Sequence, residues 1–298
     1  MGNYDDILNI QQKVEQRGTQ LSSEEYAEKK RAERDRVFEL SCTSVLEVTN
    51  DGGKFKQFLD AQSHFDRYSA VNTLLIIAQK PDATRIGNYD YWKDRGGFIK
   101  KDEKGISILE PQEYEKEDGT QGVGYNIKKM FDISQINTRK MKPDPMQPTY
   151  DNRHKLQALI SNAPVKITAV DTLAGSTGAK TDNATGEIKV RKGMEFEDFF
   201  KSLSQELALA QMNMSPENTT NSEFSAYCAS YLLCKKYDVD AQSFDFTDSP
   251  NVLGGLDERS AKGELQKIRD VFVEISERME QNFDLIQQEK AAKSQDAR

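Results

Sequence analysis

A short stretch of the chain places flat aromatic side chains among basic ones. Tyr89, Tyr91 and Trp92 lie together in the sequence NYDYWKDR. Proteins that hold unpaired nucleic-acid strands need rings for base stacking beside cations that meet the phosphates. The cations around these rings are Lys80, Arg85, Lys93 and Arg95, followed by Lys100, Lys101 and Lys104. The pattern indicates a single-strand binding groove; the alternatives are a core position for Trp92 and ordinary solvated lysines.

The segment before these rings offers three further polar groups. Residues 54–80 carry apolar side chains at three- and four-residue spacing, which predicts helix. Arg67, Tyr68 and Asn72 fall on one stripe of that expected helix. They would present a guanidinium, a ring and an amide to the same groove, so we add them to the candidate DNA-binding residues.

A second candidate site lies in the sequence KSLSQELALAQ, residues 201–211. A peptidase helix of the H-E-x-x-H type places two histidines four residues apart, with a glutamate beside the first as general base. Here Gln205 and Leu209 stand at the histidine positions and only Glu206 is in place. Leucine offers a metal no donor, and an amide is a poor one. We therefore expect an amphipathic helix without metal. Its buried stripe would consist of Leu203, Leu207 and Ala210.

Other potential metal ligands are few. The chain has three cysteines and two histidines, with no C-x-x-C and no H-x-x-x-H pair. Such spacings cannot close a familiar zinc site. These residues are Cys42, Cys228, Cys234, His64 and His154. We expect reduced, buried thiols and no cofactor.

Composition sets the class of protein. The chain has 298 residues, of which 36% are hydrophobic and 30% charged, as in a soluble, helix-rich protein with room for two modest domains. The N-terminus lacks a signal-peptide pattern and no apolar run is long enough to span a membrane, so we expect a cytoplasmic protein without a membrane partner. The formal net charge is −8. Residues 51–150 are the least acidic part, although they contain the acidic loop 113–118.

The predicted elements give an α+β protein with two domains. Residues 1–50 form a helical arm, in which Ser22 or Ser23 caps a charged helix. Residues 51–137 combine helix with a small sheet built from GGFIKK, GISILEP and VGYNIKKMFDIS. Residues 138–153 contain three prolines and form a linker.

Residues 154–298 form the second expected domain, which is mostly helical. It contains a helix near residues 154–161, a strand in PVKITAV, a β-hairpin around KTDNATGEIKV and the QELAL helix. A helix in SEFSAYCASYLLCKKYD and a C-terminal helix from about Asp257 complete it.

The first domain resembles a known family. In residues 61–135 the motifs FDRYSAVNTLLI, QKPDAT, YDYWKDRG, KKDEKGISIL and FDISQ occur in the order found in the N-terminal domain of ArdC-like antirestriction proteins, also found in LtrC-like proteins of conjugative elements. The resemblance implies a domain that binds single-stranded DNA.

The second half is similar to the zincin-like metallopeptidase domain of the same family. The resemblance places QELAL at the zinc-binding helix and SEFSAYCASYLLC at the helix that supplies a third ligand, a carboxylate. That alignment puts Tyr227 at the carboxylate position, so all three ligand positions, Gln205, Leu209 and Tyr227, are altered. The resemblance therefore implies a pseudo-metallopeptidase that keeps the fold without the chemistry.

Taken together, these features predict a non-enzymatic, single-stranded-DNA-binding protein of a mobile element or phage, with an antirestriction or conjugative-transfer role. Its partners would be single-stranded DNA and a host defence or conjugation protein. One alternative is a protein-binding anti-defence inhibitor or adaptor with a vestigial DNA groove. The other is an active zinc peptidase with an unusual site.

Overall fold

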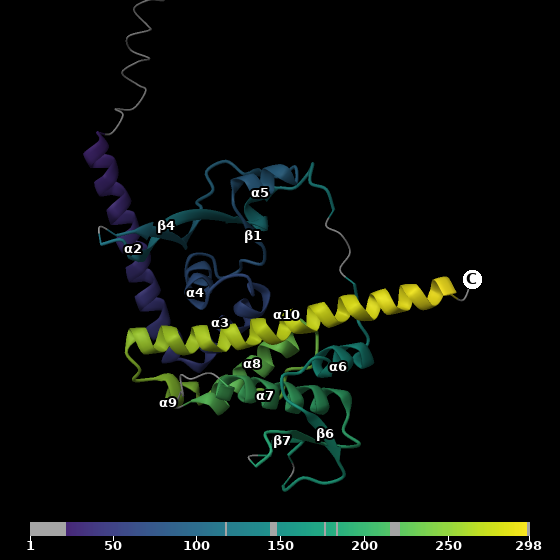
Figure 1. Cartoon of the computed structure of the whole chain (residues 1–298). Coiled ribbons are helices and arrows are strands. Elements are labelled where there is room, and N and C mark those ends of the chain that lie inside the picture. Colours follow the sequence, from purple (N-terminus) through teal and green to yellow (C-terminus); the bar gives the residue numbers. More distant parts are fainter. Residues whose placement is uncertain are drawn as a thin grey trace, which may run out of the picture.

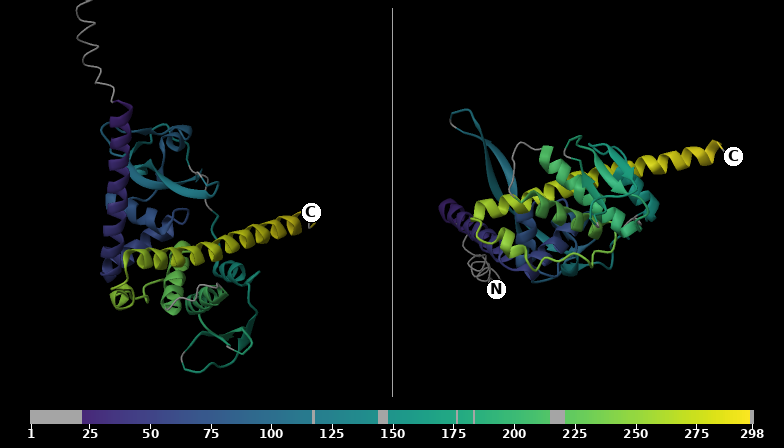
Figure 2. Two further views of the ribbon diagram at one scale, coloured as in Figure 1. Left: turned by 60° about the vertical axis from the view of Figure 1, so that its left-hand side comes forward. Right: turned by 90° about the horizontal axis from the view of Figure 1, so that it is seen from below.

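The computed structural model describes residues 22–116, 118–143, 148–175, 177–182, 184–214 and 221–296. Two long helices frame it, α2 (Ser23–Thr49) and α10 (Glu258–Asp296). Helix α10 crosses the molecule between the sheet of the first half and the elements of the second (Figures 1 and 2). The fold class is α+β, as predicted.

The predicted charged helix is confirmed as α2, and Ser22 is its cap. The Ser22 hydroxyl accepts a hydrogen bond from the Glu25 amide at 3.1 Å, and the Glu25 carboxylate accepts one from the Ser22 amide at 2.8 Å. This reciprocal pair satisfies two donors that the first helical turn leaves open. Residues 1–21 of the expected arm lie outside the described residues.

The helix predicted over residues 54–80 is two helices, α3 (Gly52–His64) and α4 (Ala70–Gln79). Ser69 caps α4 by accepting a hydrogen bond from the Asn72 amide at 3.2 Å. The Gln62 amide donates to the Phe65 carbonyl at 3.0 Å and so holds the turn. The expected helical stripe is therefore wrong: Arg67 and Tyr68 lie in the turn between α3 and α4, and only Asn72 is helical.

The predicted small sheet is confirmed in part, because the expected strand in GGFIKK does not join it. Strands β1 (Ile86–Gly87), β4 (Gln121–Asp132) and β3 (Ile106–Glu115) pair antiparallel in that order. A separate pair joins β2 (Phe98–Ile99) to β5 (Ile136–Asn137). A short helix, α5 (Tyr89–Asp94), which was not predicted, follows β1, and a 3-10 turn, η1 (Ile133–Gln135), follows β4.

Helix α4 covers the outer edge of β3. The Asn72 side chain donates to the Leu109 carbonyl at 2.8 Å and accepts from the Leu109 amide at 2.9 Å. Two turns further along α4, Gln79 donates to the Ser107 carbonyl at 2.8 Å and accepts from its amide at 2.9 Å. Two amide side chains thus satisfy the backbone groups that an edge strand leaves open.

The second half has the predicted elements. Helix α6 (Asn152–Ile160) precedes strand β6 (Ile167–Val170), and β7 (Ala179–Thr181) and β8 (Ile188–Arg191) form the predicted hairpin. Helices α7 (Phe196–Met214), α8 (Ser222–Lys236) and α9 (Ser249–Leu253) follow. The described helices include none with the length and apolar character that crossing a membrane requires.

One apolar core spans both halves of the chain. The ring of Phe55 on α3 stacks on Phe224 of α8 with centroids 5.7 Å apart, and the Tyr231 hydroxyl of α8 donates to Asp60 of α3 at 2.7 Å. The largest buried cluster joins side chains of α2, α3 and α4 to those of α6, α7, α8 and α10. The predicted linker at residues 138–153 therefore does not separate two apolar cores, and the domain boundaries stay a prediction.

Candidate nucleic-acid interface

Four of the predicted DNA-binding residues line one groove, which has a volume of about 380 Å³. Arg67 and Tyr68 come from the turn between α3 and α4, Arg85 from the segment before β1, and Tyr91 from α5. These positions are far apart in sequence and come together because β1 pairs with the end of β4.

The two arginines of the groove, Arg67 and Arg85, differ in the contacts that their guanidinium groups make. Arg67 is exposed and makes no hydrogen bond or ion pair within the part of the chain that the structure describes. The guanidinium of Arg85 lies over the Trp92 ring, 5.4 Å from its centroid. The acidic neighbour Asp66 pairs with Lys236 at 2.7 Å, which offsets its charge. Arg67 therefore presents to the groove a guanidinium that is not engaged within the described residues.

Two tyrosines, Tyr68 and Tyr91, line the groove. A Cβ atom on Gly87 would lie 2.1 Å from the Tyr91 ring, so the missing side chain at residue 87 makes room for Tyr91. The guanidinium of Arg95 lies 4.6 Å from the Tyr91 centroid and covers one face of that ring. Burial, and the nearby Tyr91, raise the pKa of Tyr68, so its hydroxyl stays protonated at neutral pH. The groove thus offers hydroxyl donors and a partly covered ring.

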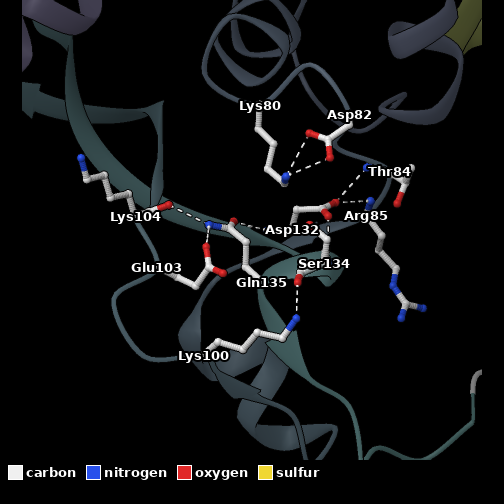
Figure 3. Close-up of polar contacts among 10 residues, drawn as sticks. All are labelled: Lys80, Asp82, Thr84, Arg85, Lys100, Glu103, Lys104, Asp132, Ser134 and Gln135. Atoms are coloured by element: carbon white, nitrogen blue, oxygen red, sulfur yellow. Dashed lines mark hydrogen bonds and ion pairs between the residues drawn. The ribbon is translucent and has the colours of Figure 1, made fainter.

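Asp132 anchors the segment that carries Arg85 (Figure 3). Its carboxylate accepts hydrogen bonds from the amides of Thr84 at 2.8 Å, Arg85 at 2.9 Å and Ser134 at 2.8 Å. Burial alone would raise the pKa of Asp132, but these hydrogen bonds outweigh it and hold the pKa below the usual range. The aspartate of the FDISQ motif is therefore a positioning residue for the groove.

Gln135, the last residue of the same motif, fixes the loop between β2 and β3 (Figure 3). Its amide donates to the Lys104 carbonyl and to the Glu103 carboxylate, both at 2.9 Å. Its oxygen accepts from the Asp132 amide at 2.9 Å. Sequence reasoning named neither residue, although the D-x-x-Q spacing of a capping box was a usable signal.

Two other predicted lysines, Lys80 and Lys104, line a neighbouring hollow of about 870 Å³, together with Lys129. Lys80 pairs with Asp82 at 2.9 Å, and the Lys100 amine donates to the Ser134 carbonyl at 2.6 Å. Residues 80–82 line this hollow, whereas Thr84 and Arg85 line the first groove. Lys101 is exposed and lines neither.

Two predicted binding residues have a different role. Trp92 is fully buried and its indole donates to the Phe131 carbonyl of β4 at 2.9 Å, so the prediction that its ring stacks on a base is wrong. Asn72 uses its amide to hold β3, as described above, and does not line the groove. Tyr89 keeps an exposed ring, with the Lys93 amine 5.9 Å from its centroid.

Sequence reasoning missed five polar residues that line the groove: His64, Asp66, Thr84, Asn88 and Lys128. Asn88 accepts a hydrogen bond from the Tyr91 amide at 2.8 Å and so caps α5. Lys128 pairs with Glu110 across β3 and β4. Only the fold reveals these neighbours, because the groove is assembled from three separate segments.

The altered peptidase positions are engaged in packing and in hydrogen bonds. Leu209 packs against the large core, and the Tyr227 hydroxyl accepts from the Asp245 amide at 2.8 Å. Glu206 accepts from the amide of Thr181 at 2.7 Å and from its hydroxyl at 2.6 Å, which ties β7 to α7. Gln205 is half-buried on the same helix. These residues do not fit a zinc ion, since leucine has no donor atom.

The remaining potential metal ligands are scattered through the fold. Within the described ranges, no three His, Cys, Asp or Glu side chains gather closely enough to hold a metal. The three cysteines are free; Cys228 and Cys234 are buried, and Cys42 is half-buried. Burial raises the pKa of Cys234 to about 12, so this thiol stays protonated.

Comparison with known proteins places the groove in a family domain. Residues 47–148 match the model of the N-terminal domain of anti-restriction factor ArdC. No curated protein matches the chain. Crystal structures of the antirestriction ArdC protein from the R388 plasmid are similar. The metal-free one has 17% identity and a TM-score of 0.45, covering 72% of this chain and 86% of that one. The Mn(II)-bound one has 15% identity and a TM-score of 0.47, covering 72% and 84%. The family model thus confirms the resemblance of the first half: residues 47–148 are similar to the ArdC N-terminal domain.

Proposed function

We propose that the chain binds single-stranded DNA in the groove between the α3–α4 turn, β1 and α5, and serves an antirestriction or transfer role for a mobile element or phage. The observation that carries this proposal is the convergence of Arg67, Tyr68, Arg85 and Tyr91 on one groove. The match of residues 47–148 to the ArdC N-terminal domain supports the antirestriction role.

The chemistry of the groove suits an unpaired strand of any sequence. Guanidinium groups contact phosphates, and tyrosine hydroxyls and rings meet bases. Base faces are open to such contacts only when the strand is single, because a duplex stacks them on one another. We therefore expect a preference for single strands with little dependence on sequence.

The test is fluorescence anisotropy of the full chain with single- and double-stranded DNA of equal length and sequence. We expect tighter binding to the single strand, with affinity falling as salt rises. Equal or tighter binding to the duplex, or binding to neither, contradicts the proposal and favours the protein-binding adaptor.

We also propose that the second half acts without peptidase chemistry. Gln205, Leu209 and Tyr227 stand at the three ligand positions implied by the resemblance, and Glu206 holds Thr181. Elemental analysis of the purified chain is expected to find no stoichiometric zinc. Glu206→Gln retains an oxygen that accepts from Thr181 and is expected to leave DNA affinity unchanged. About one zinc per chain, removable with loss of function, would overturn this part.

A further inference from the structure

The β3–β4 hairpin continues beyond the body of the molecule (Figure 2). Its register pairs Ile108 with Lys128 near the base and Tyr114 with Gly122 near the tip. Directly opposed residues of an antiparallel pair point to the same side, and side chains alternate along each strand. The even-numbered residues of 106–114 and 122–130 therefore share one side, which we call the groove face.

The groove face is continuous with the nucleic-acid groove. At its base Ile106, Ile108 and Met130 are buried beside Phe65 and Ile86. Met130 and Lys128 also line the groove itself. From there the face runs outward along β3 from Ile108 to Tyr114, a distance of about 20 Å at the usual rise of a strand.

The two faces of the hairpin differ in charge. On the groove face Lys128 pairs with Glu110, and the Asn126 side chain hydrogen-bonds Gln112, so no net charge remains there. Glu113 and Glu115 point to the opposite face. That face turns toward α2, since Tyr125 meets Phe38 with ring centroids 5.9 Å apart. The charges of Glu113 and Glu115 are thus directed away from the groove face.

Tyr114 ends the groove face with a supported ring. A Cβ on Gly122 would lie 2.7 Å from the ring carbon Cζ, and one on Gly124 would lie 3.5 Å from Cε1. The ring therefore rests on two glycines of β4, yet the residue stays 50% exposed. A ring supported on one side and open on the other can stack on a base at little entropic cost.

We propose that the bound strand leaves the groove along the groove face and that Tyr114 is a stacking platform for one of its bases. This inference rests on the proposed function and adds a residue and a path to it. The Gln112 and Asn126 amides lie between the groove and Tyr114, where they would meet the polar edges of bases.

The test compares variants of the full chain on oligothymidylates of about 4 and about 16 nucleotides, the range of site sizes of single-strand binding domains. Tyr114→Ala is expected to weaken binding of the longer strand about fivefold or more and to leave the shorter one unchanged. Tyr114→Phe keeps the ring and is expected to bind like the wild type. Two controls, Tyr26→Ala on α2 and Val123→Ala on the opposite face, are expected to change neither affinity.

The outcomes separate this inference from the proposed function. If the wild type binds the longer strand and Tyr114→Ala binds it equally well, the extension along the hairpin is wrong. The same holds if Tyr114→Ala weakens both strands alike. If the wild type binds neither strand, the proposed function itself fails.

Discussion

At the scale of single residues, Asp132 positions part of the groove without lining it. One carboxylate holds the backbone of Thr84, Arg85 and Ser134. A fixed backbone helps an arginine to bind phosphates, because a segment that is already ordered loses less conformational freedom on binding. Arg85 gains that fixed position from a residue of β4 that lies 47 positions later in the chain.

Replacing this carboxylate changes how stability depends on pH. The pKa of Asp132 is lower in the folded chain than the value of about 3.9 for an unfolded aspartate, so its stabilising effect is complete above that value and is lost as the pH falls. Asp132→Asn is expected to cost about 1–3 kcal/mol at pH 7 and less near pH 3. Denaturant midpoints at the two pH values measure this. An unchanged difference between wild type and variant would contradict the assigned role.

Residue types predicted part of the groove. Arg67, Arg85 and Tyr91 were identified because a cation or ring is required wherever a strand binds. Trp92 could not be assigned, because the Y-x-x-W spacing does not say which ring faces the core. Its partner, the Phe131 carbonyl, lies 39 positions away and is recognised only in the fold.

At the scale of elements, the packing of α5 on β1 places Tyr91 in the groove. Tyr91 occupies the space that a side chain at residue 87 would need. Gly87→Ala is expected to displace the ring and weaken single-strand affinity severalfold. Gly263→Ala on α10 is the matched control, because no atom lies near its added Cβ, and it is expected to leave affinity unchanged and stabilise the helix by about 0.5–1 kcal/mol. Equal affinities of the two variants would show that this packing does not shape the groove.

The periodicity of apolar residues predicted most of the helices and strands. It did not predict where one helix ends and the next begins. The apolar spacing of residues 54–80 runs through both α3 and α4, so it does not reveal the turn between them. The turn is made by polar contacts of Gln62 and Ser69. Because the turn was not predicted, Arg67 and Tyr68 were expected on a helix. They reach the groove from the turn instead.

At the scale of the whole molecule, the shared core predicts cooperative unfolding. Helix α4 buries Leu74 in the large cluster and Leu75 and Ile76 against the sheet, so it belongs to both halves. Trp92 is the only tryptophan and reports on the sheet, while far-UV circular dichroism reports mainly on the helices. The two signals are expected to give one coincident denaturant transition. A fluorescence transition at lower denaturant would show that the first half unfolds separately.

The central claim is that Arg67 and its neighbours bind the phosphates of a single strand. It is tested most directly by measuring single-strand affinity against salt for the wild type, Arg67→Ala and the exposed control Arg153→Ala. Arg67→Ala is expected to bind more weakly. Its slope of log affinity against log salt is expected to be shallower by about 0.7, the value for a protein that neutralises one phosphate fewer on a single strand. Arg153→Ala should match the wild type in both. An Arg67→Ala variant with the affinity and slope of the wild type would show that Arg67 does not bind phosphates.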